Sequence, residues 1–181
     1  MEQRAPKTTM RKVATGVTLG AVAGLLLVFA VPSYNHGEAS IAGSTARPFS
    51  FELDGKQMQL SDYRGRVVIL NFWATWCLPC VEETQSLVAL QKEVAPRNAT
   101  VLGVSIDDDA QAYQQFLVDH KIDFPTFRDP SEKIATAYGT HMWPETYIIG
   151  RDGRIVRKFI GEQDWTSPEM TAYINSLFQN N

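Results

Sequence analysis

The chain has 181 residues, of which 44% are hydrophobic, and its formal net charge is −3. This length supports one substantial domain and leaves little for a second. Residues 1–12 carry a net charge of +3, so the rest of the chain is acidic at −6, and no basic patch of the kind that binds nucleic acid is present. We therefore expect a single folded domain with no nucleic-acid partner.

A long uncharged segment follows the basic start of the chain. Residues 13–35 contain no charged side chain, and residues 13–32 are long enough to cross a bilayer as a helix, with residues 1–12 kept in the cytoplasm. The alternative is a cleaved signal peptide with its apolar core at residues 20–31 and a cleavage site at residues 28–30, which Pro32 makes a poor site. We favour a single-pass anchor in the cytoplasmic membrane because of the length. Both interpretations place the rest of the chain on the extracytoplasmic, periplasmic side.

Residues 33–46 are small or polar without apolar periodicity, which predicts a tether. The folded domain is then expected over residues 47–181. It opens with two short alternating runs at residues 49–53 and 57–60, and the Asp54-Gly55 pair between them predicts a β-hairpin.

The apolar run at residues 67–73 predicts a strand at the centre of a covered sheet. The tetrad Cys77-Leu-Pro-Cys80 follows it and contains both cysteines of the chain. Two cysteines three residues apart, where a strand passes into a helix, can close a disulfide within the first helical turn, which is the arrangement of a redox centre. A zinc site would need two further ligands, and no second metal-type pair is formed by the histidines, which are His36, His120 and His141.

The rest of the domain alternates between helices and strands. Apolar periodicity predicts a helix between Pro79 and Pro96, and a second buried strand follows at residues 100–106. We attribute the three acids at residues 107–109 to capping of an amphipathic helix at 110–120 rather than to a cation site. The chain continues with a short strand at 124–127, a helix at 131–138, a hairpin of strands at 145–149 and 155–160, and a terminal helix at 167–178. This order predicts an α/β sandwich with a mixed sheet.

The run VILNFWATWCLPC at residues 68–80, followed by WPETY at 143–147, resembles the thioredoxin-fold proteins of the TlpA/ResA/CcmG type. The segments PFSFELDG (48–55) and LSDYRG (60–65) resemble the redoxin, or AhpC/TSA, branch of that fold. The resemblance covers the whole domain. It implies a thioredoxin-like fold with an N-terminal β-hairpin, and a membrane-anchored thiol-disulfide oxidoreductase of a group that includes the cytochrome c maturation reductases.

The chemistry of the tetrad follows from its place at a helix start. Cys77 would lie at the amino end of the helix, where free backbone N–H groups and the helix dipole favour its thiolate, so we predict that it is the nucleophile. Cys80, one turn deeper, would resolve the mixed disulfide. The redox-active disulfide itself is then the only redox group required, without a further cofactor or metal. A purely structural disulfide is the alternative that spacing alone leaves open.

Glu83 lies one turn beyond Cys80 and can point back beneath the dithiol. ResA-like proteins carry a buried acid at the matching position, and a carboxyl in apolar surroundings can exchange protons with the resolving thiol. Asn71 stands where cytosolic thioredoxins have an aspartate, so Glu83 is the candidate replacement. The alternative is that Glu83 belongs to a solvated helix face.

The family places a cis-proline loop opposite the two cysteines, and Pro144 matches it. Such a loop leaves the backbone of the preceding residue, Trp143, free to pair with an extended substrate segment. Trp143 could grip a peptide or could serve as plain packing, and Trp76 is expected at the edge of the site. We predict substrate-binding roles for Trp76, Pro79, Trp143 and Pro144.

Two other classes compete with a protein-disulfide reductase. A thiol peroxidase of the redoxin branch would have proline and threonine at the positions of Leu70 and Ala74, so that signature is absent. A copper carrier or metal-site assembly factor would hold Cu(I) on the two thiols, but no methionine or histidine cluster supports it. No GxGxxG motif follows a strand to bind NADPH or flavin, so electrons are expected from a membrane thiol transporter. The expected partner is a protein with a disulfide, and apocytochrome c is the leading candidate.

Overall fold

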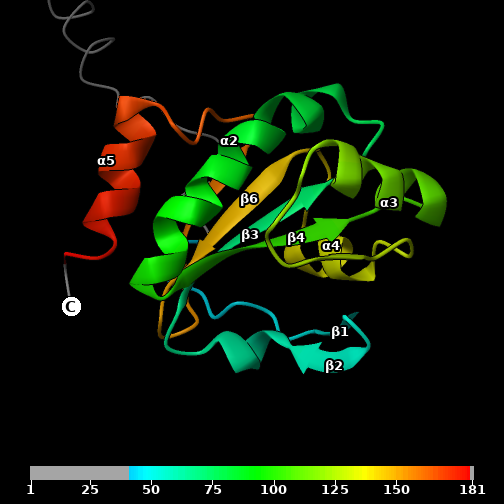
Figure 1. Ribbon diagram of the computed structural model, residues 1–181. Coiled ribbons are helices and arrows are strands. Elements are labelled where there is room, and N and C mark those ends of the chain that lie inside the picture. The colour runs from blue at the N-terminus through cyan, green and yellow to red at the C-terminus, as the bar shows by residue number, and fades with distance from the viewer. Residues whose placement is uncertain (1–40, 180–181) are drawn as a thin grey trace, which may run out of the picture. The chain divides into compact units, whose positions relative to one another are not determined.

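The computed structural model of the protein describes residues 41–179 (Figure 1). The predicted anchor at residues 13–32 lies outside the described residues. Within the described range, no helix combines the length and apolarity that a membrane crossing requires.

The domain opens with the predicted hairpin. Strand β1 (Ser50–Leu53) pairs antiparallel with β2 (Lys56–Gln59). The two turn residues, Asp54 and Gly55, have φ angles of 50° and 73°, the left-handed values that a tight hairpin turn needs and that this residue pair tolerates. A 3₁₀ turn, η1 (Leu60–Tyr63), then leads to the central sheet.

A five-stranded mixed sheet forms the middle layer, in the order β5-β4-β3-β6-β7. The central strand β3 is parallel to β4 and antiparallel to β6. All seven residues of β3 are buried, which confirms the prediction of a covered central strand. The strands are β3 (Val67–Trp73), β4 (Ala99–Ser105), β5 (Thr126–Arg128), β6 (Glu145–Ile149) and β7 (Ile155–Ile160).

Helices cover both faces of this sheet. They are α2 (Leu78–Val94), α3 (Ala110–Asp119), α4 (Lys133–Tyr138) and α5 (Pro168–Ser176), and a 3₁₀ turn, η2 (Ala95–Arg97), follows α2. Val67 and Ile69 of β3 pack with α2 and α5, which lie side by side in Figure 1. The alternate residues Val68, Leu70 and Phe72 pack with the hairpin and α4. Because successive side chains of a strand point to opposite faces, one seven-residue run supplies both cores, and the predicted thioredoxin-like α/β fold is confirmed.

The sheet register brings the two segments singled out in the sequence to one end of the molecule. Phe72, next to last in β3, pairs with Glu145, the first residue of β6. The residues that follow β3, including Cys77, therefore lie beside the residues that precede β6, including Pro144. This end of the sheet is where the functional site forms.

The three acids after β4 do not act alike. Asp109 caps α3 as predicted, since its side chain accepts hydrogen bonds from the backbone N–H groups of Gln111 and Ala112. Asp107 is buried and does not cap the helix, so the capping interpretation was wrong for this residue. The reason is tertiary: the end of β4 lies beside the end of β3, and Asp107 bonds to the loop that leaves β3.

Candidate active site

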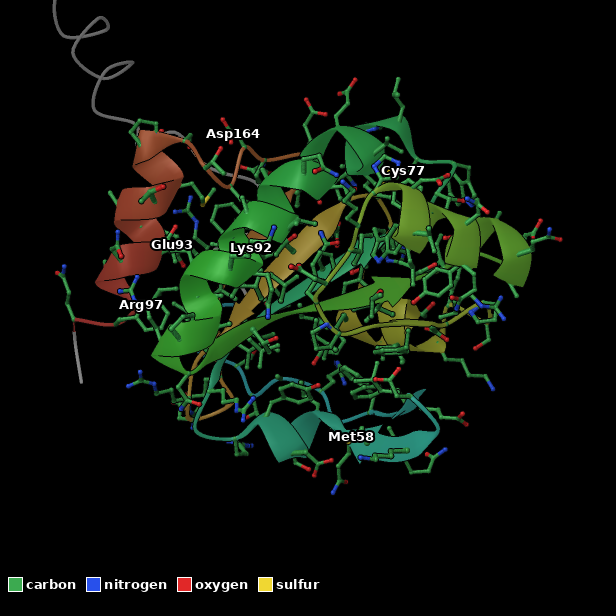
Figure 2. The ribbon with its side chains drawn as sticks, in the orientation of Figure 1. Met58, Cys77, Lys92, Glu93, Arg97 and Asp164 are labelled. Atoms are coloured by element: carbon green, nitrogen blue, oxygen red, sulfur yellow. A yellow bond between two sulfur atoms is a disulfide. The ribbon has the colours of Figure 1, made fainter. Side chains whose placement is uncertain are left out.

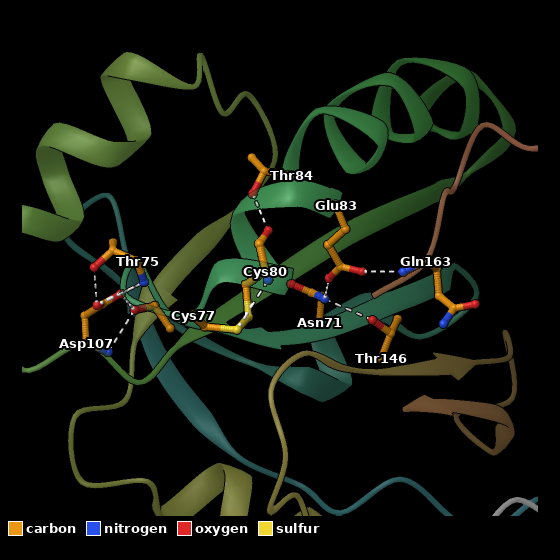
Figure 3. Close-up of a disulfide and its surroundings, with 10 residues drawn as sticks. Asn71, Thr75, Cys77, Cys80, Glu83, Thr84, Asp107, Thr146 and Gln163 are labelled. Carbon is orange, nitrogen blue, oxygen red and sulfur yellow. Dashed lines mark hydrogen bonds between the residues drawn. A yellow bond between two sulfur atoms is a disulfide. The ribbon is translucent and has the colours of Figure 1, made fainter. Parts of the chain in front are cut away.

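Cys77 and Cys80 form a disulfide at the start of α2 (Figure 3). Cys77 is the N-cap residue of the helix, and its Sγ accepts a hydrogen bond of 3.3 Å from the backbone N–H of Cys80. Pro79 lies within the first helical turn, where a missing N–H costs nothing. Cys77 is 6% exposed and Cys80 2%, so both sulfurs are largely covered and Cys77 is the more accessible.

The position at a helix start determines what this pair can do. The unpaired N–H groups and the dipole at the amino end of α2 stabilise negative charge, so after reduction they favour a thiolate on Cys77. Cys80 lies one turn into the helix, within reach of the Cys77 sulfur. The arrangement can therefore accept and release an electron pair by breaking and reforming one S–S bond.

Asp107 holds the loop between β3 and the cysteines. Its carboxylate accepts hydrogen bonds from the backbone N–H of Thr75 at 3.1 Å and from the Thr75 hydroxyl at 2.6 Å, and a third from the hydroxyl of Ser105 at 2.6 Å. Sequence reasoning missed this role. The available signal was that an acid directly follows the strand expected beside β3, at the end of the sheet that carries the dithiol.

Glu83 is buried beneath the dithiol, with 3% of its surface exposed, so the interpretation as a solvated helix face is wrong. One carboxyl oxygen accepts a hydrogen bond of 2.8 Å from the side-chain amide of Asn71, which also donates to the Thr146 hydroxyl at 2.9 Å. The other oxygen accepts from the backbone N–H of Gln163 at 3.1 Å and from the Trp165 indole N–H at 3.3 Å. Asn71, Gln163 and Trp165 all donate to the carboxyl group of Glu83.

Burial raises the pKa of Glu83 from its usual 4.5 to about 7, because removal from water disfavours the charged carboxylate. The hydrogen bonds from Gln163, Asn71 and Trp165 act in the opposite direction and limit the rise in pKa. A carboxyl group that titrates near neutral pH can both accept and donate a proton under physiological conditions. Gln163 and Trp165 lie about 80 residues from Glu83 along the chain, and no local pattern predicted their contribution.

A cis peptide bond joins Trp143 to Pro144, and Pro144 is buried while Trp143 is half-buried against the core that includes the cysteines. Trp143 therefore packs in part against this core, and its role in substrate binding stays a prediction. The next strand starts directly at Glu145, whose side chain forms a buried ion pair of 2.7 Å with Lys158.

The rim of the site carries exposed apolar side chains. Trp76 is 64% exposed and Leu78 is 68% exposed, and both flank Cys77 in the sequence. Met142, next to the cis-proline loop, is 57% exposed. Trp76 thus lies at the edge of the site with its ring in solvent, and these side chains offer apolar contacts to a protein substrate. Within residues 41–179, no group of three or more histidine, cysteine or acidic side chains is placed to hold a metal ion.

A thioredoxin-like fold with a disulfide in the first turn of the helix after the central strand defines a thiol-disulfide oxidoreductase. Residues 42–158 match the model of the AhpC/TSA family. The chain belongs to that family.

Individual relatives carry the same activity in their names. The chain is 31% identical to a thiol-disulfide oxidoreductase ResA of Bacillus thuringiensis (strain Al Hakam) over 126 residues, which cover 70% of this chain and 72% of the relative. It is 28% identical to ResA of Bacillus subtilis (strain 168) over 166 residues, covering 91% and 92%. Among solved structures, the thiol:disulfide interchange protein DsbE from Chlorobium tepidum superposes with a TM-score of 0.71 at 25% identity, covering 76% of this chain and 97% of that one. The chain is therefore a thiol-disulfide oxidoreductase of the ResA/DsbE type.

Proposed function

We propose that this oxidoreductase works as a reductant of disulfides in specific partner proteins on the outer side of the cytoplasmic membrane. The observation that carries the proposal is the buried Glu83, which lies one turn beyond Cys80 on α2 and has a pKa of about 7. A dithiol that reduces a disulfide must lose the proton of its second thiol, and a neutral-pH base close to that thiol supplies the route.

The reaction balances as two exchanges. The Cys77 thiolate attacks one sulfur of the substrate disulfide, which forms a mixed disulfide and releases the other substrate sulfur as a thiolate. Glu83 accepts the proton of the Cys80 thiol, and the Cys80 thiolate attacks the Cys77 sulfur. The second substrate thiolate leaves and the Cys77–Cys80 disulfide closes, so two electrons pass to the substrate.

The location and the electron supply rest on the sequence. The uncharged residues 13–32 behind a basic flank support a membrane anchor with the domain exported. A reductant in an oxidising compartment needs a dedicated electron source, and a membrane thiol transporter is the proposed donor. Apocytochrome c, with its pair of haem-attachment cysteines, is the proposed substrate because the sequence resembles the cytochrome c maturation reductases.

The reduction potential of the Cys77–Cys80 pair tests the direction of electron flow. Equilibration of the domain with glutathione and with dithiothreitol should give a value near or below about −270 mV, as for thioredoxin. A value near about −120 mV would identify an oxidant and overturn the proposal.

Trapping in cells tests the substrate class. Cys80→Ser should accumulate mixed disulfides between Cys77 and partner proteins, because the resolving thiol is absent. Cys77→Ser is the matched control and should trap none. If Cys80→Ser trapped no protein while its Cys77 thiol still reacted with an alkylating reagent, reduction of protein substrates would be ruled against.

A further inference from the structure

Four arginines gather at the end of the sheet opposite the dithiol. Arg64 and Arg66 precede β3, and Arg151 and Arg154 belong to the turn between β6 and β7. Because β3 and β6 are antiparallel, the start of one strand lies beside the end of the other, and the backbone N–H of Gly65 donates to the Arg151 carbonyl at 3.0 Å. We call these four residues the arginine surface. The seven residues of β3 separate it from the dithiol by about 20 Å.

Two arginines of this surface also bond within the protein: Arg64 donates to the Asp152 carbonyl, and Arg154 donates to the Gly43 carbonyl at 2.7 Å. Arg64, Arg66 and Arg154 are nevertheless exposed, and the buried Nε of Arg151 has no hydrogen-bond acceptor among the described residues, so donors remain for an anion. The acidic side chains in the same turns are Asp62 and Asp152, and Asp152 lies 3.8 Å from Arg154. The positive charge of the four guanidinium groups is thus only partly compensated.

Two hollows with mixed polar and apolar linings adjoin these arginines. One hollow of about 330 Å³ is lined by Arg151 and Asp152 together with the apolar side chains of Val67, Val156 and Leu177. A smaller one of about 50 Å³ is lined by Arg64 and Arg66 with Leu60 and Val68. Guanidinium groups beside apolar surface are what a lipid headgroup with its attached chains meets favourably.

The start of the described chain joins the domain at this same end. Thr45 forms a β-bridge with Arg154, and the backbone N–H of Gly43 donates to the Ile155 carbonyl at 2.7 Å. The predicted anchor ends at residue 32, so nine residue steps separate it from Ile41 and span about 30 Å at most. A chain of this length keeps the arginine surface close to any bilayer that holds the anchor.

The opposite end of the domain is acidic. Exposed carboxylates lie at the starts of α2 and α3 and after β7, at the end of the sheet that carries the dithiol, and they are Glu82, Asp108, Asp109, Glu162 and Asp164. Figure 2 labels Asp164 and Cys77 near one end of the sheet, and Arg97, which forms an ion pair with Glu93, near the other. An anionic membrane attracts one end of this domain and repels the other, which gives the domain a preferred orientation.

We propose that the arginine surface binds the anionic phospholipid headgroups of the membrane that holds the N-terminal segment, and that this contact turns the dithiol toward soluble partners. The proposal rests on the membrane anchor of the proposed function. The lipid contact and the chemistry use different residues, so each can be tested without the other.

Vesicle binding by the isolated domain tests the proposal. The solved DsbE chain from Chlorobium tepidum folds by itself and is matched over 97% of its length by 76% of this chain, so we choose a fragment of residues 41–181 for the test. We expect it to sediment with vesicles of phosphatidylglycerol at low salt, and not with vesicles of phosphatidylcholine. Arg64→Gln with Arg66→Gln should weaken the partition coefficient about 25-fold, at about fivefold per arginine.

Two matched variants separate charge at this surface from charge in general. Lys56→Gln with Lys133→Gln removes two exposed cations from the hairpin and α4, and should leave vesicle binding within about twofold. Arg64→Lys with Arg66→Lys keeps the charge and should restore binding. Equal binding of the wild-type fragment to the two kinds of vesicle would overturn the proposal. An equal loss of binding in Arg64→Gln with Arg66→Gln and in Lys56→Gln with Lys133→Gln would overturn it as well. The fragment lacks residues 1–40, so membrane fractionation of the full chain tests the anchor separately.

Discussion

Glu83→Gln gives the sharpest test of the buried carboxyl group. A rise in pKa from 4.5 in the unfolded chain to about 7 in the folded one corresponds to about 3 kcal/mol of free energy. Between these two pH values the folded protein keeps the proton that the unfolded chain has lost. The stabilising contribution of neutral Glu83 is therefore complete below pH 4.5 and is lost as the pH rises toward 7.

The measurement is the free energy of unfolding in urea for the oxidised protein and for Glu83→Gln, at intervals from pH 4 to pH 8. The glutamine cannot ionise, so the other titrating groups cancel in the difference between the two proteins. We expect wild type to lose about 3 kcal/mol relative to Glu83→Gln across this range. Loss of hydrogen bonds from Asn71 or Gln163 shifts the whole difference by a constant and leaves its slope intact.

Glu52→Gln removes one exposed glutamate from β1 and provides the baseline for this comparison. If the difference between wild type and Glu83→Gln had no more slope than that baseline, the carboxyl of Glu83 would titrate at its ordinary pKa. The assignment of Glu83 as a proton carrier at neutral pH would then fail.

Three further substitutions test the elements around the disulfide. Asp107→Asn should lower the free energy of unfolding in urea by about 1–3 kcal/mol, because the amide cannot accept every hydrogen bond now made to the carboxylate. The control Asp108→Asn, at an exposed neighbour, should change it by less than about 0.5 kcal/mol. Lys158→Met should cost about 3–5 kcal/mol in the same assay, because it leaves the Glu145 carboxylate without its ion-pair partner in the interior. An added Glu145→Leu substitution should recover most of that loss. Equal instability of the single and double variants would contradict a buried ion pair. Trp76→Ala should raise KM for a disulfide-containing protein about fivefold through loss of apolar contact, and should leave the rate with a small aromatic disulfide unchanged. A parallel loss of activity with both substrates would refute a role of Trp76 in docking.

Local sequence patterns were enough to predict most helices and strands of the fold. The seven apolar residues of β3 and the Asp54-Gly55 turn specify their own conformations, because burial on two faces and a positive φ each demand particular residue types. The position of Glu83 also followed from spacing, since a residue three after Cys80 in a helix lies on the same face. These predictions needed no knowledge of the tertiary structure.

The parts that sequence reasoning missed depend on contacts between distant segments. Asp107 and Asp109 look alike in the sequence, yet one bonds to the loop after β3 and the other caps α3. Only the pairing of β3 with β4 distinguishes them. Likewise, Gln163 and Trp165 reach Glu83 from the segment after β7, and nothing in their local sequence indicates a partner on α2.

Asn71 explains why a single carboxyl group can serve this site. Its amide donates to Glu83 at 2.8 Å, so an aspartate in its place would put two carboxylates in contact inside the protein, where both could not stay ionised. A neutral donor at the strand position stabilises the ionised form of Glu83, while burial favours its protonated form. The two effects oppose each other and leave the pKa at about 7, where proton uptake and release are both accessible. In this site, therefore, the proposed proton carrier Glu83 has its backbone on helix α2, one turn from Cys80, and Asn71 of the central strand supplies a hydrogen bond that limits the rise in its pKa.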